Sequence, residues 1–143
     1  MFACTEPIFV GVFVFFALDT AIPDRFNYVV NGDQTTCTII SAKNKNSFSI
    51  DIPEEIDGYT VTKITSWAFK GHKCSTVFFP DTIEYIGEGA FAECENLGSV
   101  HGLEKCTNLK EIQSQTFKDC CDLYEISLPE GLEKIGIYAF LRC

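Results

Sequence analysis

Four segments of the chain share one pattern, in which an isoleucine stands five residues before a phenylalanine. The phenylalanines are spaced 22, 26 and 23 residues apart, and they are Phe69, Phe91, Phe117 and Phe140. A period of about 20 to 29 residues is typical of a solenoid, in which each unit packs on the next. Because one unit cannot bury its apolar side alone, the period predicts a stacked, continuous core.

A second motif recurs between the phenylalanines and predicts short strands. Apolar residues alternate just before a proline, at Ile50/Ile52, Val77/Phe79 and Ile126/Leu128. Period two in so short a run is typical of a half-buried strand, and proline ends the strand because it lacks a backbone donor. We therefore predict an α/β repeat solenoid with about three and a half repeats, in which short parallel strands alternate with turns or short helical segments on the convex side.

The repeat closely resembles the BspA-like leucine-rich repeats. The segments that carry the resemblance are IGEGAFAEC (86–94), IQSQTFKDC (112–120) and IGIYAFLRC (135–143), together with the strand motifs ending in Leu-Pro or Phe-Pro. Residues 26–64 also resemble the lead-in to the first repeat of that family. Two departures are the third unit, where 99–112 lacks the proline that ends the strand, and Cys74, which takes the place of a leucine. The resemblance implies a surface protein of host-associated bacteria or parasitic protists.

The amino terminus contains an unbroken apolar run, residues 8–18, which is eleven residues long. A membrane span needs about 20 residues, so the run fits the core of a signal peptide better. We expect 1–21 to be a signal peptide, 22–63 a lead-in and capping segment, and 64–143 the repeats. An uncleaved anchor, a buried strand or a wrongly assigned start stay open, because the first seven residues carry no Lys or Arg and no small-x-small cleavage triplet follows.

Three cysteines stand three residues after a phenylalanine of the repeat: Cys94, Cys120 and Cys143. Stacking would place them in a column about 5 Å apart, a distance that allows disulfides. Buried free thiols fit the same column, and we favour this interpretation because free Cys packs as a small apolar residue. If export removes Cys4, an odd number remains, so a free thiol or an intermolecular bridge is expected among Cys37, Cys74, Cys106 and Cys121. The spacing does not fit a zinc site.

Charge and motifs exclude several classes of function. Eleven basic and twenty acidic residues give a net charge of −9, without a basic patch, so we expect no nucleic-acid partner. The two histidines, His72 and His101, are not accompanied by a G-x-S-x-G or phosphate-binding motif. We therefore predict no enzymatic activity, no metal and no cofactor.

The outer face of the strands is the predicted binding surface. With the alternating apolar residues inward, the outward residues are Ser49, Thr76, Ser99, Glu125 in one row and Asp51, Phe78, His101, Ser127 in the next. We predict that Asp51, Thr76, Phe78, Ser99, His101, Glu125 and Ser127 contact a partner, with Phe78 as an aromatic anchor. Alternatively, Phe78 lies under the amino-terminal segment, and a slip of one residue would exchange the two faces.

These observations favour a non-enzymatic, exported or cell-surface protein that binds a protein or another macromolecule. The resemblance adds adhesion to host proteins or cells, or a surface-antigen role. Membrane association is expected only through the amino-terminal segment. Two alternatives stay open: an intracellular scaffold with reduced thiols, and a fragment of a longer membrane-anchored surface protein, because the last unit is left open after Cys143.

Overall fold

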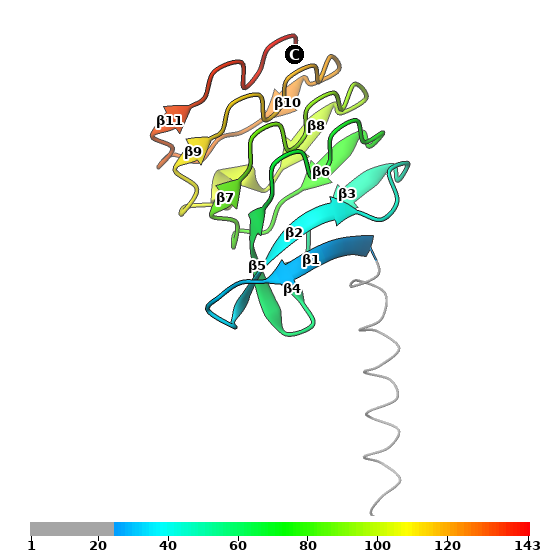
Figure 1. Ribbon diagram of the computed structural model, residues 1–143. Helices are drawn as coiled ribbons and strands as arrows, with labels where there is room; N and C mark the ends of the chain where they lie inside the picture. Colours follow the sequence, from blue (N-terminus) through cyan, green and yellow to red (C-terminus); the bar gives the residue numbers. More distant parts are fainter. Residues whose placement is uncertain (1–24) are drawn as a thin grey trace, which may run out of the picture.

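Residues 25–143, which a computed structural model describes, form a β-solenoid (Figure 1). The predicted signal peptide, 1–21, lies outside the described residues. Among the described residues, no helix has the length and apolar character needed to cross a membrane. The β-solenoid formed by residues 25–143 confirms the repeat architecture expected from the phenylalanine spacing.

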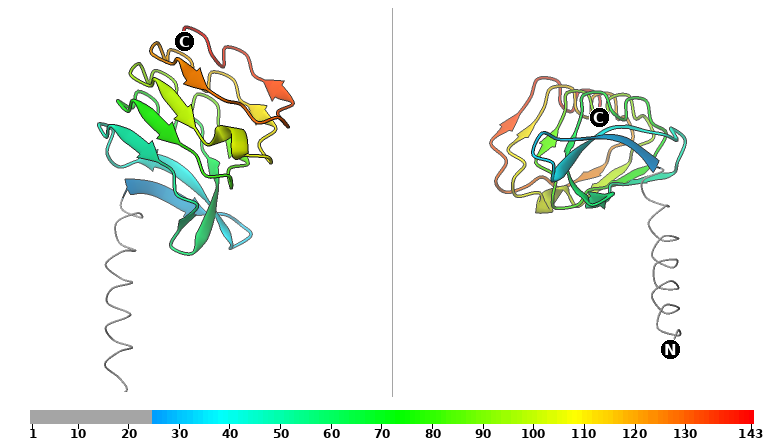
Figure 2. Two further views of the ribbon diagram at one scale, coloured as in Figure 1. Left: turned by 180° about the vertical axis from the view of Figure 1, so that it is seen from behind. Right: turned by 60° about the horizontal axis from the view of Figure 1, so that its bottom comes forward.

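One row of strands forms a parallel sheet across four units. Its strands are β3 (Ser49–Asp51), β6 (Thr76–Phe78), β8 (Ser99–His101) and β10 (Glu125–Ile126), in the order β10-β8-β6-β3. They lie side by side in the left view of Figure 2. Ile50, Val77, Val100 and Ile126 are paired across the sheet, and the first three are buried. The predicted inward row and its register are thus correct.

A second row of strands carries the isoleucines that precede each phenylalanine. It contains β5 (Tyr59–Ile64), which pairs with β7 (Tyr85–Ile86), and β9 (Glu111–Ile112), which pairs with β11 (Lys134–Ile135). Ile64, Ile86 and Ile112 are completely buried between the two rows. The core therefore lies between two rows of short strands and the convex turns.

The phenylalanines of the repeat form a stacked column along the solenoid. Their ring centroids are 5.0 Å apart for Phe69–Phe91, 5.6 Å for Phe91–Phe117 and 5.5 Å for Phe117–Phe140, and the rings are within 14° of parallel. Offset stacking at such distances stabilises aromatic pairs beyond the burial of their area. The column is the centre of the core.

The convex side corrects the α/β prediction, because its segments are turns and the described residues contain no α-helix. Two residues away from each phenylalanine, on both sides, the backbone has a positive φ of 59° to 69°, at Trp67, Gly71, Gly89, Glu93, Gln115, Asp119, Tyr138 and Arg142. The backbone N–H of each buried phenylalanine donates to the next unit, as from Phe91 to the carbonyl of Thr116 at 2.9 Å. An α-helix would need these N–H groups within its own unit. The short helical segments were therefore wrongly predicted.

The third unit differs from the others at its strand end. There Gly102, with a φ of 85°, follows β8, and a 3-10 helix, η3 (Leu103–Lys105), takes the place of the proline-ended segment. A Cβ atom on Gly102 would lie 2.1 Å from the carbonyl oxygen of Phe79, so only glycine fits this turn. The longer spacing of this unit thus accommodates the extra turn.

A hairpin covers the first end of the solenoid. Strand β1 (Phe26–Val30) pairs antiparallel with β2 (Thr36–Ala42). Strand β5 pairs in parallel with β2 on one side and antiparallel with β4 (Glu55–Ile56) on the other. The right view of Figure 2 shows the hairpin crossing the end of the stack. Phe26 is buried and its ring meets Phe69 edge-on, at 6.1 Å and 88°. This hairpin lies within the predicted capping segment 22–63, of which the structure describes 25–63.

Candidate binding surface on the parallel sheet

The outer face of β3, β6, β8 and β10 carries an exposed aromatic pair at its centre. Asp51, Phe78 and His101 are paired across three adjacent strands and point away from the core. Phe78 is 44% exposed, and its ring stacks on that of His101 at 5.2 Å and 26°. An apolar ring supported by a neighbour on a sheet face is suited to contact another molecule. The alternative stated above, that Phe78 lies under the amino-terminal segment, involves residues outside the described range.

The other predicted contact residues differ in their access to solvent. Thr76 is half-buried and its hydroxyl lies 3.3 Å from that of Ser99. Ser99 occupies its predicted row, yet only 6% of it is exposed, so it is not accessible to a partner. Glu125 and Ser127 are exposed beside β8, and Asp51 is exposed at the opposite side of the sheet, 3.7 Å from the guanidinium of Arg25. The structure therefore brings together Thr76, Phe78 and His101 and places the charged residues on either side of them.

Two exposed aromatic residues beside this face were missed by the sequence analysis. Phe48 is 78% exposed and Tyr124 is 81% exposed, and both line a groove of about 530 Å³. They stand directly before β3 and β10, where strict alternation along the strand predicts an inward side chain. The strands are only two or three residues long, so the alternation does not extend beyond them. The signal in the sequence was an aromatic residue at the same repeat position in two units.

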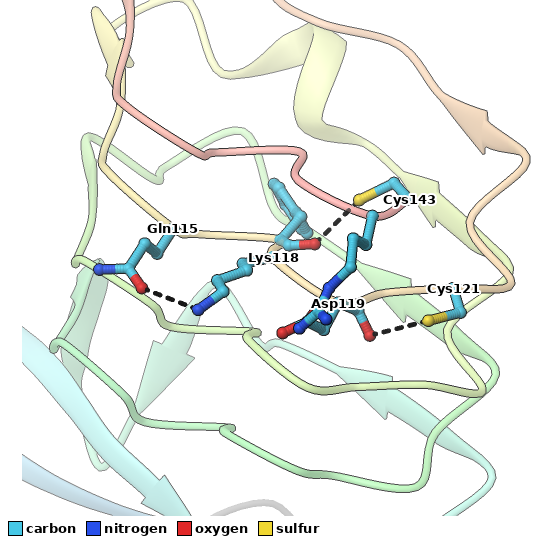
Figure 3. Close-up of polar contacts among 7 residues, drawn as sticks. Gln115, Lys118, Asp119, Cys121 and Cys143 are labelled. Atoms are coloured by element: carbon cyan, nitrogen blue, oxygen red, sulfur yellow. Dashed lines mark hydrogen bonds and ion pairs between the residues drawn. The ribbon is translucent and has the colours of Figure 1, made fainter.

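The cysteine column is a ladder of thiol to carbonyl contacts. Each thiol donates to the phenylalanine carbonyl of the preceding unit, from Cys94 to Phe69 at 3.2 Å, from Cys120 to Phe91 at 3.2 Å and from Cys143 to Phe117 at 2.9 Å. Figure 3 shows the last of these contacts. All seven cysteines between residues 25 and 143 are free thiols. The favoured interpretation of the column as thiols agrees with this geometry.

Burial makes most of these thiols poor nucleophiles. It raises the pKa of Cys37 to about 11 and that of Cys106 to about 12, and it also raises the pKa of Cys120. Since the thiolate is the reactive form, these side chains are chemically inert at neutral pH. Between residues 25 and 143 there is also no group of three or more His, Cys, Asp or Glu side chains that could hold a metal ion.

His72 has a structural role. It is buried, its Nε2 lies 2.9 Å from the carbonyl oxygen of Asn44, and its Nδ1 accepts a hydrogen bond from the backbone N–H of Cys74 at 3.0 Å. Both contacts require the neutral ring with the proton on Nε2. Burial lowers the pKa of His72 below 6.5, which agrees with a neutral ring. The ring therefore joins the loop before β3 to the loop before β6.

Polar side chains on the convex turns join successive units. Arg142 pairs with the carboxylate of Asp119, and this contact raises the pKa of Arg142 and lowers that of Asp119. The amide of Gln115 donates to Glu88 of the preceding unit at 3.0 Å. Within the same turn, the Lys118 ammonium lies 3.5 Å from the side-chain oxygen of Gln115 (Figure 3). Exposed pairs of this kind add little to stability, because water screens the two charges. They align the units, and nothing in their arrangement suggests a ligand.

Comparison with known proteins identifies the repeat. A sequence model of the BspA type leucine rich repeat region, with six copies, matches residues 41–143. The chain belongs to this family. A search of curated proteins found no match.

Three solved structures illustrate the similarity to this fold. A leucine-rich repeat protein from Bacteroides ovatus is 29% identical over 84% of this chain, with a TM-score of 0.74. This chain spans only 32% of that protein's length. A leucine-rich repeat protein from Bacteroides capillosus is 30% identical, with a TM-score of 0.68, over 78% of this chain and 83% of its own. A leucine rich cell surface protein from Faecalibacterium prausnitzii shares the fold at 21% identity and a TM-score of 0.51, over 82% of this chain and 44% of its own.

Proposed function

We propose that this chain is a non-enzymatic binding module of an exported or cell-surface protein, and that the outer face of β3, β6, β8 and β10 contacts a protein partner. The observation that carries the proposal is the Phe78–His101 pair. An aromatic ring that is 44% exposed at the centre of a sheet contributes little to the core of its own chain. Such residues are typical of the energetically dominant part of protein interfaces.

The chemistry of the described residues supports a binding role over a catalytic one. His72 is held by two hydrogen bonds within the structure, and His101 stacks on Phe78. Burial raises the pKa of Cys37, Cys106 and Cys120. Catalysis by a nucleophile needs an activated group with a base within reach, and neither these histidines nor these thiols provide such a pair.

Export and surface location rest on the amino-terminal sequence and on the fold family. The apolar run of residues 8–18 is the basis for the proposed signal peptide, 1–21, which precedes a capping segment, 22–63, and the repeats, 64–143. The Faecalibacterium prausnitzii protein with the same fold is a cell surface protein. Adhesion to host proteins or cells, or a surface-antigen role, is the form that this binding would take in such a location.

A pair of matched variants tests the sheet face. Phe78→Asp places a charge on the outer face, and Tyr85→Asp makes the same kind of change on β7, in the other row of strands, where Tyr85 is 40% exposed. Partners are cross-linked on intact cells with each variant, and far-UV circular dichroism checks that both variants are folded. We expect Phe78→Asp to lose a partner that the wild type and Tyr85→Asp retain. Retention of every partner by Phe78→Asp would contradict the proposed surface.

Two observations fit other cellular locations of the protein. The seven free thiols of residues 25–143 fit an intracellular scaffold as well, because thiols stay reduced in the cytosol. The chain also spans only 32% of the Bacteroides ovatus protein, which fits a piece of a longer, membrane-anchored surface protein. The intact mass of the protein taken from its own cells, unfolded in urea and alkylated without reduction, separates the three cases. Loss of about the first 20 residues supports export, a full-length chain with eight alkylated thiols supports the scaffold, and a much larger mass supports the longer protein.

A further inference from the structure

The most exposed aromatic side chains of residues 25–143 share one position in the repeat. Phe48 and Tyr124, at 78% and 81% exposure, stand directly before β3 and β10. Ser75 and Gly98 occupy the same position in the two units between them. Backbone N–H groups connect the row from unit to unit, from Ser75 to Phe48 at 2.8 Å, from Gly98 to Ser75 at 2.9 Å and from Tyr124 to Gly98 at 3.0 Å. The two aromatic residues are therefore three strand spacings, or about 14 Å, apart.

Small residues between the aromatic side chains make this row a groove. The groove holds about 530 Å³, and its lining includes both rings together with Ser75, Gly98 and Thr76. A Cβ atom on Gly98 would lie 2.8 Å from Cε1 of Tyr124, so the tyrosine ring lies over the glycine. Because Gly98 has no side chain, nothing fills the bottom of the groove at this position, and the Tyr124 ring can lie over it.

Two polar side chains line the groove without being used by the fold. The amide of Asn96 and the carboxylate of Asp122 both line it, both are exposed, and neither has a side-chain hydrogen-bond partner within residues 25–143. The hydroxyl groups of Ser75 and Thr76 also line the groove, but that of Ser75 donates to the Phe48 carbonyl at 3.2 Å and that of Thr76 lies 3.3 Å from the Ser99 hydroxyl, so they add only the acceptor positions that these contacts leave free. Two apolar rings separated by hydrogen-bonding groups are suited to a ligand that is itself amphipathic.

The charge of the groove argues against ionic ligands. Among the residues that line it, Asp122 is the one charged side chain and none is basic, so a phosphate or carboxylate would be repelled. Lys73 does not line the groove, and its ammonium is paired with Glu95 at 4.0 Å. The single exposed carboxylate of Asp122 would hold a cationic ligand only weakly in water, so the lining favours a neutral ligand.

The backbone of the row also argues against an added peptide strand. The N–H groups of Ser75, Gly98 and Tyr124 are already bonded to the carbonyls of the preceding units. An extended peptide that adds to a sheet depends on free backbone groups of this kind. Recognition in this groove must therefore come from side chains.

We propose that the groove between Phe48 and Tyr124 binds a neutral oligosaccharide. The apolar C–H faces of two sugar rings pack on the two aromatic side chains, and sugar hydroxyl groups exchange hydrogen bonds with Asn96, Asp122 and the hydroxyl-bearing floor. A separation of about 14 Å between the aromatic residues suits a short chain of sugars better than a single one. This site goes beyond the proposed protein-binding face, which it adjoins at Thr76, since Phe78 and His101 do not line the groove.

Calorimetric titration of the 143-residue chain with neutral tetrasaccharides tests the proposal. The probes are cellotetraose, maltotetraose, mannotetraose and chitotetraose, which differ in linkage and in their substituents. We expect at least one to bind at millimolar concentration or better, with an affinity that does not change with salt, because the ligand carries no charge. Phe48→Ala and Tyr124→Ala should each weaken binding about tenfold, the value of one lost aromatic contact.

Two further variants distinguish the groove from an unspecific aromatic effect. Gly98→Ala adds one methyl group where the Tyr124 ring lies, so it should displace the ring and weaken binding by a similar factor. Tyr85→Ala removes an exposed aromatic side chain from β7 and should leave the affinity unchanged. Three of the four variants shorten exposed side chains, whereas Gly98 is buried beneath the Tyr124 ring, and circular dichroism checks that all four are folded.

Three results would overturn the proposal. The first is failure of all four tetrasaccharides to bind the folded chain. The second is binding that Phe48→Ala and Tyr124→Ala leave unchanged. The third is salt-dependent binding of a short arginine-containing peptide that Asp122→Asn abolishes, which would assign the groove to a basic protein segment. Because the sugar titration does not involve Phe78, it and the partner-capture experiment on the sheet face succeed or fail independently.

Discussion

Truncation of Phe117 to alanine tests the aromatic column directly. The Phe117 side chain has no solvent-exposed surface, and its ring lies between those of Phe91 at 5.6 Å and Phe140 at 5.5 Å. Burying a phenylalanine removes about 150 to 200 Å² from water, which at about 25 cal/mol/Å² gives ~4 to 5 kcal/mol. Part of this is recovered when neighbours relax, and buried Phe-to-Ala changes cost ~3 to 5 kcal/mol. We expect Phe117→Ala to lower the free energy of unfolding by about 4 kcal/mol.

Phe140→Ala provides the matched comparison. Phe140 has the same place in its unit, yet it is only partly buried and its ring stacks on one neighbour, Phe117. With less area lost and one ring pair instead of two, we expect a loss of about 2 kcal/mol. Phe117→Leu, which keeps an apolar side chain of similar volume, should cost less than about 1.5 kcal/mol.

Urea unfolding followed by far-UV circular dichroism measures these differences. The single tryptophan, Trp67, lies in the first unit and provides a local fluorescence probe. The two signals should coincide if the units unfold together, which the free-energy comparison requires. A loss below about 1 kcal/mol for Phe117→Ala, or a loss no larger than that of Phe140→Ala, would refute the column as the centre of the core.

Three further predictions follow from close contacts, burial and charge. Gly87→Ala should lower the free energy of unfolding by about 1 to 3 kcal/mol in urea, because its Cβ would lie 2.3 Å from the backbone nitrogen of Ser66, whereas Gly131→Ala, near only the flexible end of a lysine, should change it by less than about 0.5 kcal/mol. The pKa of His72 is lowered from 6.5 by burial, so the unfolded chain binds more protons below that pH, and stability should fall as the pH drops through this range; His72→Gln should flatten this part of a stability profile measured by urea unfolding, and an unchanged profile would contradict the assignment. Among the described cysteines, Cys121 should react with iodoacetamide in the native protein and Cys143 more slowly, because burial raises the pKa of the Cys143 thiol, while the five buried thiols stay protected until urea is added, as peptide mass mapping would show.

The stacked architecture could be predicted because the same pattern of apolar residues recurs in several units. Ile50, Val77 and Val100 lie inward and in register, as the alternation before each proline indicates. The convex turns could not be predicted in the same way. Six of the eight left-handed positions in these turns are filled by residues other than glycine, such as Trp67 and Gln115, and the turns are stabilised by hydrogen bonds to the next unit. A contact between units leaves no local signal in one unit's sequence.

The exposure of side chains on the sheet face was predicted where alternation applies and missed where it stops. Phe78 is exposed on the sheet face as expected, because it lies within a strand that continues the period-two pattern. Ser99 is buried although its row is correct, since row membership does not determine how neighbouring side chains cover a residue. Phe48 and Tyr124 precede their strands, where the backbone leaves the regular conformation and the side chains turn outward.

The edge-on contact between Phe26 and Phe69 gives the solenoid a fixed starting point. Parallel rings can be added to a stack without limit, but a ring at 88° to the column presents its edge and offers no face for another. Between this starting point and Phe140, each unit meets its neighbours through the same ring stacking and the same backbone bonds. Duplication or deletion of a whole unit within that stretch would therefore change the length of the protein while preserving its geometry, which gives evolution a simple way to vary the surface that the chain exposes.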